Sequence, residues 1–348
     1  AARAAARVAA DLAVDVGGFL QGASLARRGR SLHELSAALL NGGPGYFRAA
    51  GVEELLGDTA RIYELSRQAH SLPVDVKRKC AGSEGSKIHG VVYSGSDAGK
   101  LELAYDPATK ATARSWDYSR LRYRSPDAPG PAELAALDFE PVLDALYGRQ
   151  NIVGAALLQA TAEVLGLPAS TFEEAFSSGD MGTIRLILYP GEAELRDEDT
   201  DVGISPHTDF EAFTLMHQDA TGLQLLPAHD GGPGAQWVDA PAFGEGGEYV
   251  VIVGDVLERY TNGVLRATPH RVVRTRHSRR SIIRFNAVAP EAVIEPLAPF
   301  VTADRPRAYT RCTMQQHMDT VIKNLNLGLG SWCSATNTSL SARYQYEE

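Results

Sequence analysis

The sequence predicts a helical N-terminal half packed against a β-rich core. Two observations predict this fold class. As far as residue 180 the apolar residues recur mainly at the intervals of amphipathic helices, whereas from residue 181 onward short β-prone runs are separated by Gly, Pro, Asn or Asp. No strand–helix–strand alternation and no glycine-rich phosphate loop accompany them, which argues against a Rossmann or P-loop fold. Short strands at such spacing are typical of an antiparallel sandwich or barrel.

The composition is that of a globular protein. Among 348 residues, 44% are hydrophobic and 22% are charged, which excludes a disordered chain, a coiled coil and a collagen-like repeat. With 34 basic and 43 acidic residues the net charge is −9, so we expect no nucleic-acid partner. Apolar runs such as 249–253 are too short to cross a bilayer, and we expect no membrane partner either.

Cysteine usage indicates the compartment. Cys80, Cys312 and Cys333 are widely spaced and include no C-x-x-C pair. We therefore expect a reducing compartment, the cytoplasm, with neither a disulfide framework nor a cysteine metal site. The alanine- and arginine-rich residues 1–10 are weakly similar to a transit peptide, but acidic residues follow, and we interpret them as the first turns of a helix.

The first predicted helices precede residue 70. Ser31 and Glu34 have the spacing of a capping box, and leucines follow at helical intervals. That helix should end at 41–44, where Asn, two Gly and Pro form a dense turn signal. Apolar residues at helical spacing predict a second helix over 52–68.

A long helix is predicted in the middle of the chain. Residues 82–100 are rich in Gly and Ser and should form loop with short strands. The apolar pattern then predicts a helix over 139–165, ended by the Gly and Pro that follow. Ser170 and Glu173 repeat the capping-box spacing and suggest one more helix start.

The β-prone runs supply the core. They cover 184–188, 213–216, 223–226, 249–253, 270–273 and 281–287. No internal repeat and no long linker separates two domains. We therefore expect one domain over 1–348: a helix-rich part to about 180, a β core with the functional site over about 181–300, and a C-terminal helical segment and tail over about 301–348.

Three residues among these runs suggest a metal site. His207 and Asp209 are two apart, so on a strand both side chains point to one face. His270 immediately precedes another β-prone run and can supply a third ligand from a neighbouring strand. Two histidines and one carboxylate on one face of a metal leave the opposite positions open, which suits non-haem Fe(II) enzymes that activate oxygen.

A set of short motifs surrounds these three residues. The block that leads to His270 contains Gly254-Asp255, Leu257-Glu258, Asn262-Gly263 and His270-Arg271-Val272. Further motifs follow one another along nearly the whole chain: Asp15-Val16-Gly17-Gly18, Gly45-Tyr46-Phe47, Tyr189-Pro190, His207-Thr208-Asp209-Phe210, Gly222-Leu223-Gln224-Leu225 and Arg279-x-Ser281. In content and order they resemble the 2-oxoglutarate/Fe(II) dioxygenases, and more narrowly their isopenicillin N synthase-like branch. The resemblance implies a double-stranded β-helix (jelly-roll) core.

The resemblance also implies the cofactors. His207, Asp209 and His270 correspond to the iron ligands, and Arg279, Ser281 and Tyr189 to the residues that bind the distal carboxylate of 2-oxoglutarate. The expected enzyme uses Fe(II), 2-oxoglutarate and molecular oxygen, with ascorbate as a candidate reductant. It would hydroxylate, desaturate or cyclise a small-molecule metabolite of secondary metabolism as a monomer, and release succinate and CO2.

Two alternatives stay open. One is an oxidase of the same fold that uses no 2-oxoglutarate, in which Arg279 and Ser281 serve the substrate's carboxylate. The other is a non-catalytic barrel that only binds a ligand, against which the intact triad argues. Candidate substrate-lining segments are 91–105, 116–123 and 324–332.

Two further positions bear on the site. Many plant members of the family carry asparagine where this chain has Ile187, so any co-substrate contact of that asparagine is lost or replaced. If the strand from His207 stays regular, Glu211 points into the barrel beside the iron and could meet a substrate group. The alternative is a bulge or strand end that turns Glu211 to solvent or to an arginine.

Overall fold

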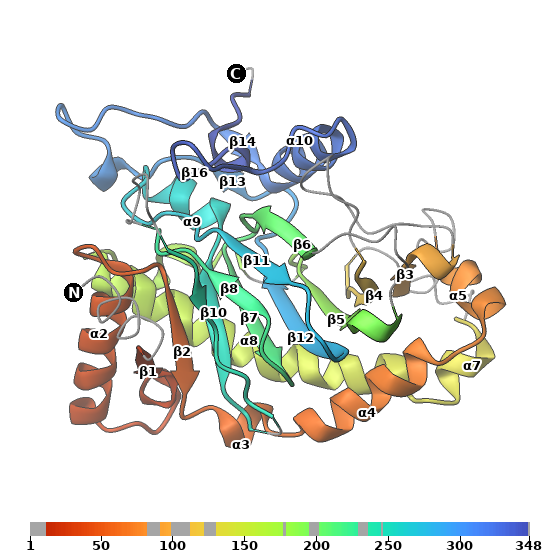
Figure 1. Ribbon diagram of the computed structural model, residues 1–348. Helices are drawn as coiled ribbons and strands as arrows, with labels where there is room; N and C mark the ends of the chain where they lie inside the picture. Colours follow the sequence, from red (N-terminus) through yellow and green to blue (C-terminus); the bar gives the residue numbers. More distant parts are fainter. Residues whose placement is uncertain are drawn as a thin grey trace.

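The computed structural model describes residues 12–81, 91–98, 112–121, 130–176, 179–194, 202–228, 236–244 and 246–346. Within them the chain forms two main sheets with helices on the outside (Figure 1). The helices are α2 (Leu25–Leu39), α3 (Glu53–Leu56), α4 (Thr59–His70), α5 (Val74–Cys80), α7 (Ala132–Ala135), α8 (Phe139–Val164), α9 (Asp255–Tyr260) and α10 (Met314–Asn326).

The larger sheet has eight strands in the order β1–β2–β10–β7–β12–β5–β4–β3. Neighbouring strands are antiparallel, except for the parallel pair of β1 and β2. The strands are β1 (Ala13–Asp15), β2 (Tyr46–Ala50), β3 (Val91–Ser94), β4 (Arg114–Tyr118), β5 (Thr183–Tyr189), β7 (Phe213–Gln218), β10 (Tyr249–Val253) and β12 (Arg279–Asn286).

The smaller sheet has four strands in the order β6–β11–β8–β9, all antiparallel. They are β6 (Val202–His207), β8 (Leu223–Leu225), β9 (Val238–Asp239) and β11 (His270–Val273). Two further pairs of very short strands lie towards the C-terminus: β13 (Val293–Ile294) with β14 (Cys312–Thr313), and β15 (Trp332–Cys333) with β16 (Thr338–Ser339).

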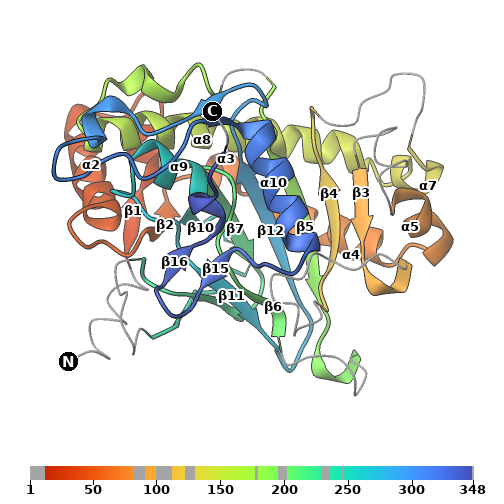
Figure 2. The same cartoon turned by 90° about the horizontal axis from the view of Figure 1, so that it is seen from above.

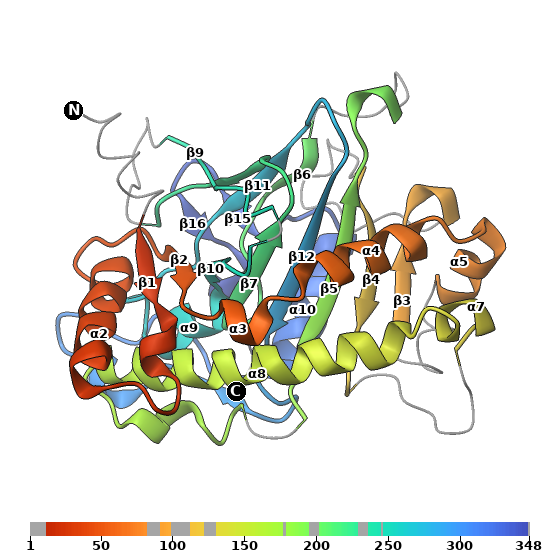
Figure 3. The ribbon, with the colours of Figure 1, turned by 90° about the horizontal axis from the view of Figure 1, so that it is seen from below.

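The layers are visible in two orthogonal views. Helices α4 and α8 contact the larger sheet, and the smaller sheet lies on the other side of it (Figures 1 and 3). Seen from above in Figure 2, α10, β15 and β16 lie nearest the viewer, so C-terminal residues cover this end of the core. The packing is largely apolar because α8 buries residues such as Leu146, Val153 and Leu157.

The β-prone runs and the long helix are confirmed. Each predicted run coincides with β5, β7, β8, β10, β11 or β12, and α8 ends one residue before the predicted end at 165. The N-terminal half is less purely helical than expected, because β1 to β4 also belong to it. Strand β2 carries little sequence signal of its own, and it forms by pairing with β10, some 200 residues away in the chain.

The start of α8 at Phe139 is confirmed, but the two helix starts predicted from capping-box spacing are wrong. Helix α2 begins after Ser24, whose hydroxyl accepts a hydrogen bond from Arg27 N–H, and Ser31 lies buried inside that helix. Its end before the turn at 41–44 is confirmed by the positive φ of Asn41. The segment 52–68 divides into α3 and α4, and Ser170 begins no helix but lies in a 3-10 turn.

Two observations concern compartment and membrane. No helix in the described residues is long and apolar enough to cross a bilayer. Cys80, Cys312 and Cys333 are all free thiols.

Candidate active site

The two histidines meet across a strand pair. His207 is the last residue of β6, His270 is the first of β11, and the two are direct partners in the antiparallel register. Their ring centroids are 4.2 Å apart, and both side chains are buried. The pairing brings together two residues that are far apart in the sequence. This is the arrangement expected if His270 supplies a ligand from a strand beside that of His207.

Asp209 completes the cluster from a turn. Strand β6 ends at His207, and the chain bends before β7 begins at Phe213. The Asp209 Oδ1 atom nevertheless lies 3.7 Å from His207 Nε2 and 3.5 Å from His270 Nε2. One ligand atom from each residue lies within 4.8 Å of the others, a spacing compatible with a shared metal ion.

Hydrogen bonds orient the three side chains. His207 Nδ1 lies 2.9 Å from the Ser205 carbonyl oxygen, and His270 Nδ1 lies 3.1 Å from that of Thr268. Each Nδ1–H can donate to its carbonyl, which leaves Nε2 with a lone pair aimed at the cluster. The Thr214 hydroxyl donates to Asp209 Oδ2 over 2.5 Å and fixes the carboxylate.

The electrostatics favour a bound cation. Burial, and secondarily the charge of His270, lowers the pKa of His207 to about 3. Burial alone would raise the pKa of Asp209, but the charge and hydrogen bond of His270 bring it down to about 2. For His270, burial opposes protonation, yet the Asp209 charge prevails and raises the pKa. Asp209 is therefore ionised and His207 neutral near pH 7, the forms that bind metals.

Arg279, the first residue of β12, lies inside the protein beside Tyr189. In the β5–β12 register Arg279 faces Tyr189 and Ser281 faces Ile187. The Arg279 guanidinium lies 4.5 Å from the centre of the Tyr189 ring, and its Nη2 donates to Gln218 Oε1 over 2.6 Å and to Ser281 Oγ over 2.8 Å. The three residues that the sequence singled out for co-substrate binding thus lie together.

The surroundings of Arg279 fit a carboxylate ligand. The residue is completely buried, no carboxylate of the described residues forms an ion pair with it, and Nη1 has no hydrogen-bond partner. Burial lowers the pKa of this guanidinium. A buried cation is costly unless it is paired, and its planar fork matches a carboxylate. The donor set therefore suits the distal carboxylate of 2-oxoglutarate.

A cavity of about 320 Å³, its open mouth included, is bordered by the histidine–aspartate cluster and by Tyr189, the neighbour of Arg279. Its lining residues are Arg185, Ile187, Tyr189, Ile204, His207, Asp209, Met216, His270, Val272, Ile283 and Phe285. Residues 279 and 281 lie on the same face of β12 as the lining residues 283 and 285, because alternate residues of a strand share a face. Ile187 belongs to the apolar wall.

Sequence reasoning did not find the substrate-side residues. Among the described residues, none of the cavity lining comes from the segments expected to supply it; 99–105 and 122–123 of those segments lie outside the described part. Arg185 lines the cavity instead, with two hydrogen bonds of 2.7 Å to Asp117 of the neighbouring strand. Only the register of β4 with β5 brings these two residues together, and no local motif marks it.

Glu211 does not follow the regular-strand expectation. The strand has already ended at His207, and Glu211 lies in the bend that follows. It is not turned to solvent either, since only 9% of it is exposed, and Phe210 N–H donates to its carboxylate. Burial, and then the nearby Asp209 charge, raises the pKa of Glu211 to about 7. It is not one of the residues that line the cavity.

Two histidines and an aspartate that could hold a metal ion, close to a buried arginine without a carboxylate partner among the described residues, form the arrangement expected of non-haem oxygenases that use a keto-acid co-substrate. Comparison with known proteins agrees. Residues 182–287, which contain His207, Asp209, His270 and Arg279, match the model of the 2OG-Fe(II) oxygenase superfamily. Over these residues the chain is similar to this superfamily, and a 1-aminocyclopropane-1-carboxylate oxidase homolog of Arabidopsis thaliana is 28% identical over 71% of this chain and 68% of its own length.

Individual relatives are distant. The 2-oxoglutarate-Fe(II) type oxidoreductase hxnY of Emericella nidulans is 33% identical over 169 residues, and that alignment spans 46% of either protein. The 2-oxoglutarate-dependent dioxygenase ecdK of Aspergillus rugulosus is 26% identical over 87% of this chain and 95% of its own length. The crystal structure of the dioxygenase for auxin oxidation in rice superposes with a TM-score of 0.63 at 21% identity, covering 92% of this chain and 96% of that one.

Proposed function

We propose that this chain is a 2-oxoglutarate-dependent Fe(II) oxygenase that oxidises a small organic metabolite and releases succinate and CO2. In this proposal His207, Asp209 and His270 hold the iron, and Arg279, with Ser281 and Tyr189, binds the co-substrate. The observation that carries the proposal is Arg279: a fully buried guanidinium without a carboxylate partner among the described residues, stacked on Tyr189, which lines the same cavity as the histidine–aspartate cluster.

The proposal extends to the fold. We infer a single oxygenase domain whose core is a double-stranded β-helix. The path of the chain supports this inference, because successive strands from β5 to β8 alternate between the larger and the smaller sheet, and so do β10, β11 and β12. Two facing sheets joined by alternating connections are the hallmark of a jelly roll.

Each part of the cavity has its own task. Bound together, iron and 2-oxoglutarate would supply the activation of dioxygen. The chain itself would orient them: Arg279 pairs with the distal carboxylate, and the Nδ1 contacts of both histidines keep Nε2 turned to the metal. Apolar walls such as Ile187 and Ile283 keep bulk water from the reacting groups.

The substrate would enter on the side of Arg185. This residue and Phe285 line the cavity, and the charge of Arg185 acts on both His207 and Glu211. Asp117 holds the guanidinium in one orientation, and its Cζ lies 5.4 Å from the centre of the Phe285 ring. A fixed donor above an aromatic ring favours a small substrate that carries both an oxygen-bearing group and an apolar body.

The test is a co-substrate assay. Metal-free protein is supplied with Fe(II), 2-oxoglutarate, oxygen and ascorbate as reductant, and succinate is measured by mass spectrometry with and without a mixture of metabolites. We expect succinate to form only when Fe(II) is present, and Zn(II) or Ni(II) to inhibit, because both bind nitrogen and oxygen ligands more tightly than Fe(II).

Two results would contradict the proposal. If a metabolite were oxidised with no requirement for 2-oxoglutarate, Arg279 would serve the substrate's carboxylate, as in the oxidase alternative. If the protein bound no Fe(II) under anaerobic conditions, a ligand-binding barrel would be the better description.

A further inference from the structure

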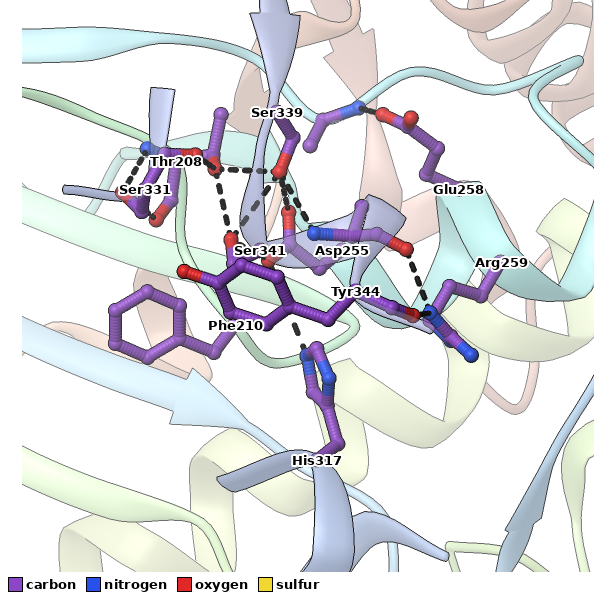
Figure 4. Close-up of polar contacts among 12 residues, drawn as sticks. Thr208, Phe210, Asp255, Glu258, Arg259, His317, Ser331, Ser339, Ser341 and Tyr344 are labelled. Atoms are coloured by element: carbon purple, nitrogen blue, oxygen red, sulfur yellow. Dashed lines mark hydrogen bonds and ion pairs between the residues drawn. The ribbon is translucent and has the colours of Figure 1, made fainter. Parts of the chain in front are cut away.

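A second buried carboxylate lies behind the metal cluster. Asp255, the first residue of α9, is completely buried, and no lysine or arginine of the described residues pairs with it. His317 Nε2 lies 3.9 Å from Oδ2, beyond hydrogen-bond distance. The Asp255 oxygens instead accept hydrogen bonds from hydroxyl groups near the C-terminus: Ser339 donates to Oδ1 over 2.7 Å, and Ser341 donates to Oδ2 (Figure 4). Asp255 therefore joins α9 to residues 331–344, here called the C-terminal segment.

The C-terminal segment also holds the residue between two metal ligands. Thr208 N–H donates to Ser331 Oγ over 3.2 Å, and the Thr208 hydroxyl lies 3.0 Å from Ser339 Oγ and 3.2 Å from the Ser331 carbonyl oxygen (Figure 4). All three residues are buried. Ser339 thus contacts both Thr208 and Asp255, and its Oγ also accepts the Ala342 N–H over 2.9 Å.

The start of α9 also holds the turn that carries Asp209, through backbone hydrogen bonds. The backbone N–H of Asp255 donates to the Asp209 carbonyl oxygen over 2.9 Å, and that of Val256 donates to the Glu211 carbonyl oxygen over 3.1 Å. Gly254 permits this approach, since a Cβ there would lie 2.3 Å from the Glu211 carbonyl oxygen. Two backbone hydrogen bonds therefore join the turn that carries Asp209 to the start of α9.

The C-terminal segment has an anchor of its own. Arg259 is completely buried one helical turn after Asp255, and its Nη1 donates to the carbonyl oxygens of Ala342, over 2.6 Å, and Tyr344, over 3.1 Å. Residues four apart lie on the same side of a helix, so one side of α9 contacts the C-terminal segment at two positions, Asp255 and Arg259. Loss of a single serine hydroxyl would leave the Arg259 contacts in place.

We propose that the C-terminal segment is a built-in part of the metal centre, and that Asp255 is a positioning residue for Asp209. The inference rests on the iron site proposed above. Asp255 reaches Asp209 through the main chain, and Ser339 reaches the same turn through Thr208. Together they hold the turn at the end of β6 in the conformation that brings the Asp209 carboxylate to both histidines. Hydrogen-bonded supports around metal ligands commonly account for about 10- to 100-fold in metal affinity.

The experiment measures Co(II) binding to the metal-free protein, under anaerobic conditions and without 2-oxoglutarate, from the visible absorption of the bound ion. Variants Ser339→Ala, Ser341→Ala and Asp255→Asn are compared with the parent. We expect each to raise the Co(II) dissociation constant, with Ser339→Ala and Asp255→Asn in the range of about 10- to 100-fold, and to alter the absorption bands because the Asp209 geometry changes. Thr336→Ala is the matched control. It removes an exposed hydroxyl of the same segment that lies 2.7 Å from Thr338 Oγ1 and should bind Co(II) like the parent.

Circular dichroism and the unfolding midpoint of each metal-free variant separate positioning from folding. A purely structural role predicts a lower midpoint with unchanged Co(II) affinity and spectrum, and that result in the folded serine variants would overturn the proposal. If Asp255→Asn does not fold, the two serine variants decide, since each lacks only one oxygen atom. A parent protein that binds no Co(II) would instead remove the metal site itself, and this inference with it.

Discussion

The three proposed ligands should be individually indispensable. His207→Ala, Asp209→Ala and His270→Ala each remove one of three protein ligands, so we expect Fe(II) affinity to fall by more than the roughly 100-fold that supporting residues can cost, and turnover to be lost. Anaerobic Fe(II) titration and succinate formation measure this. The control is His277→Ala, because His277 is exposed and outside the cluster. Activity near that of the parent in the His270 variant would assign the third ligand to another residue.

Arg279 makes the second residue-scale prediction. Arg279→Ala should raise the KM for 2-oxoglutarate by about 10- to 150-fold, since hydrogen bonds to a charged group are worth roughly 1.5–3 kcal/mol. Ser281→Ala and Tyr189→Phe should each cost less, because the guanidinium remains. Arg276→Ala, an exposed neighbour, is the matched control. An unchanged KM in the Arg279 variant, with a raised KM for the substrate, would support the oxidase alternative.

At the residue scale the sequence predicted the site residues that stand in short motifs. It missed the residues that reach the site only through strand pairing. His207, Asp209 and Arg279 stand in short motifs that can be recognised without a structure. Thr214, which fixes the Asp209 carboxylate, is found only once β7 is known to lie beside the site. For Glu211 the strand-end alternative applies, because the chain bends after His207, but the side chain is buried and not turned to solvent.

Helix α2 offers a test at the scale of a single element. The structure assigns its N-cap to Ser24, so Ser24→Ala should lower the free energy of unfolding by about 1 kcal/mol. Ser31→Ala should cost clearly less, because the Ser31 hydroxyl donates only to the Arg27 carbonyl oxygen and alanine has the better helix propensity. Urea denaturation of the two variants compares them directly. A larger loss for Ser31→Ala would restore the cap position that the sequence predicted.

Element boundaries were harder to predict than element types. The spacing of Ser31 and Glu34 imitates a capping box, but Glu34 accepts a hydrogen bond from Asp15 N–H instead. A real capping box joins Thr313 to Gln316 at the start of α10, with both reciprocal hydrogen bonds formed. Such a motif has meaning only where the backbone leaves the helix, and spacing alone does not show where that happens.

At the scale of the whole molecule, stability should depend on pH through His217. Burial lowers the pKa of this side chain below its ordinary value of 6.5. Tyr63 Oη lies 2.7 Å from Nδ1, and the Gly246 carbonyl oxygen lies 2.5 Å from Nε2, so the neutral ring is satisfied on both sides. Below a pH of about 6.5 the unfolded chain binds a proton that the folded chain does not. The free energy of unfolding should therefore decrease as the pH falls.

Urea unfolding at several pH values, from about 5 to about 7.5, brackets the ordinary histidine pKa and tests this. His217→Gln should reduce the slope of stability against pH in that range, although the variant is less stable overall. Parallel curves for the variant and the parent would mean that His217 binds protons equally in the folded and unfolded states.

The larger sheet shows why the sequence predicted only part of the overall arrangement. Six strands of the second half were predicted from their own apolar runs, whereas β2 becomes a strand by pairing with the distant β10, and β1 by pairing with β2. A sequence read locally has no access to such pairings, because the partner's position is a property of the completed fold.

The proposed support of the Asp209 turn by the C-terminal segment has a consequence for the order of events in the cell. A chain emerging from the ribosome presents His207, Asp209 and His270 well before the serines of the C-terminal segment have been synthesised. The sheets can form in that interval, but the supports of the Asp209 turn cannot. Iron should therefore bind only after the C-terminal segment has been synthesised. Chains cut short before residue 331 should bind metal weakly, even though His207, Asp209 and His270 are present. The metal content of such shortened chains, isolated from cells, would show whether iron binds before or after the C-terminal segment is complete.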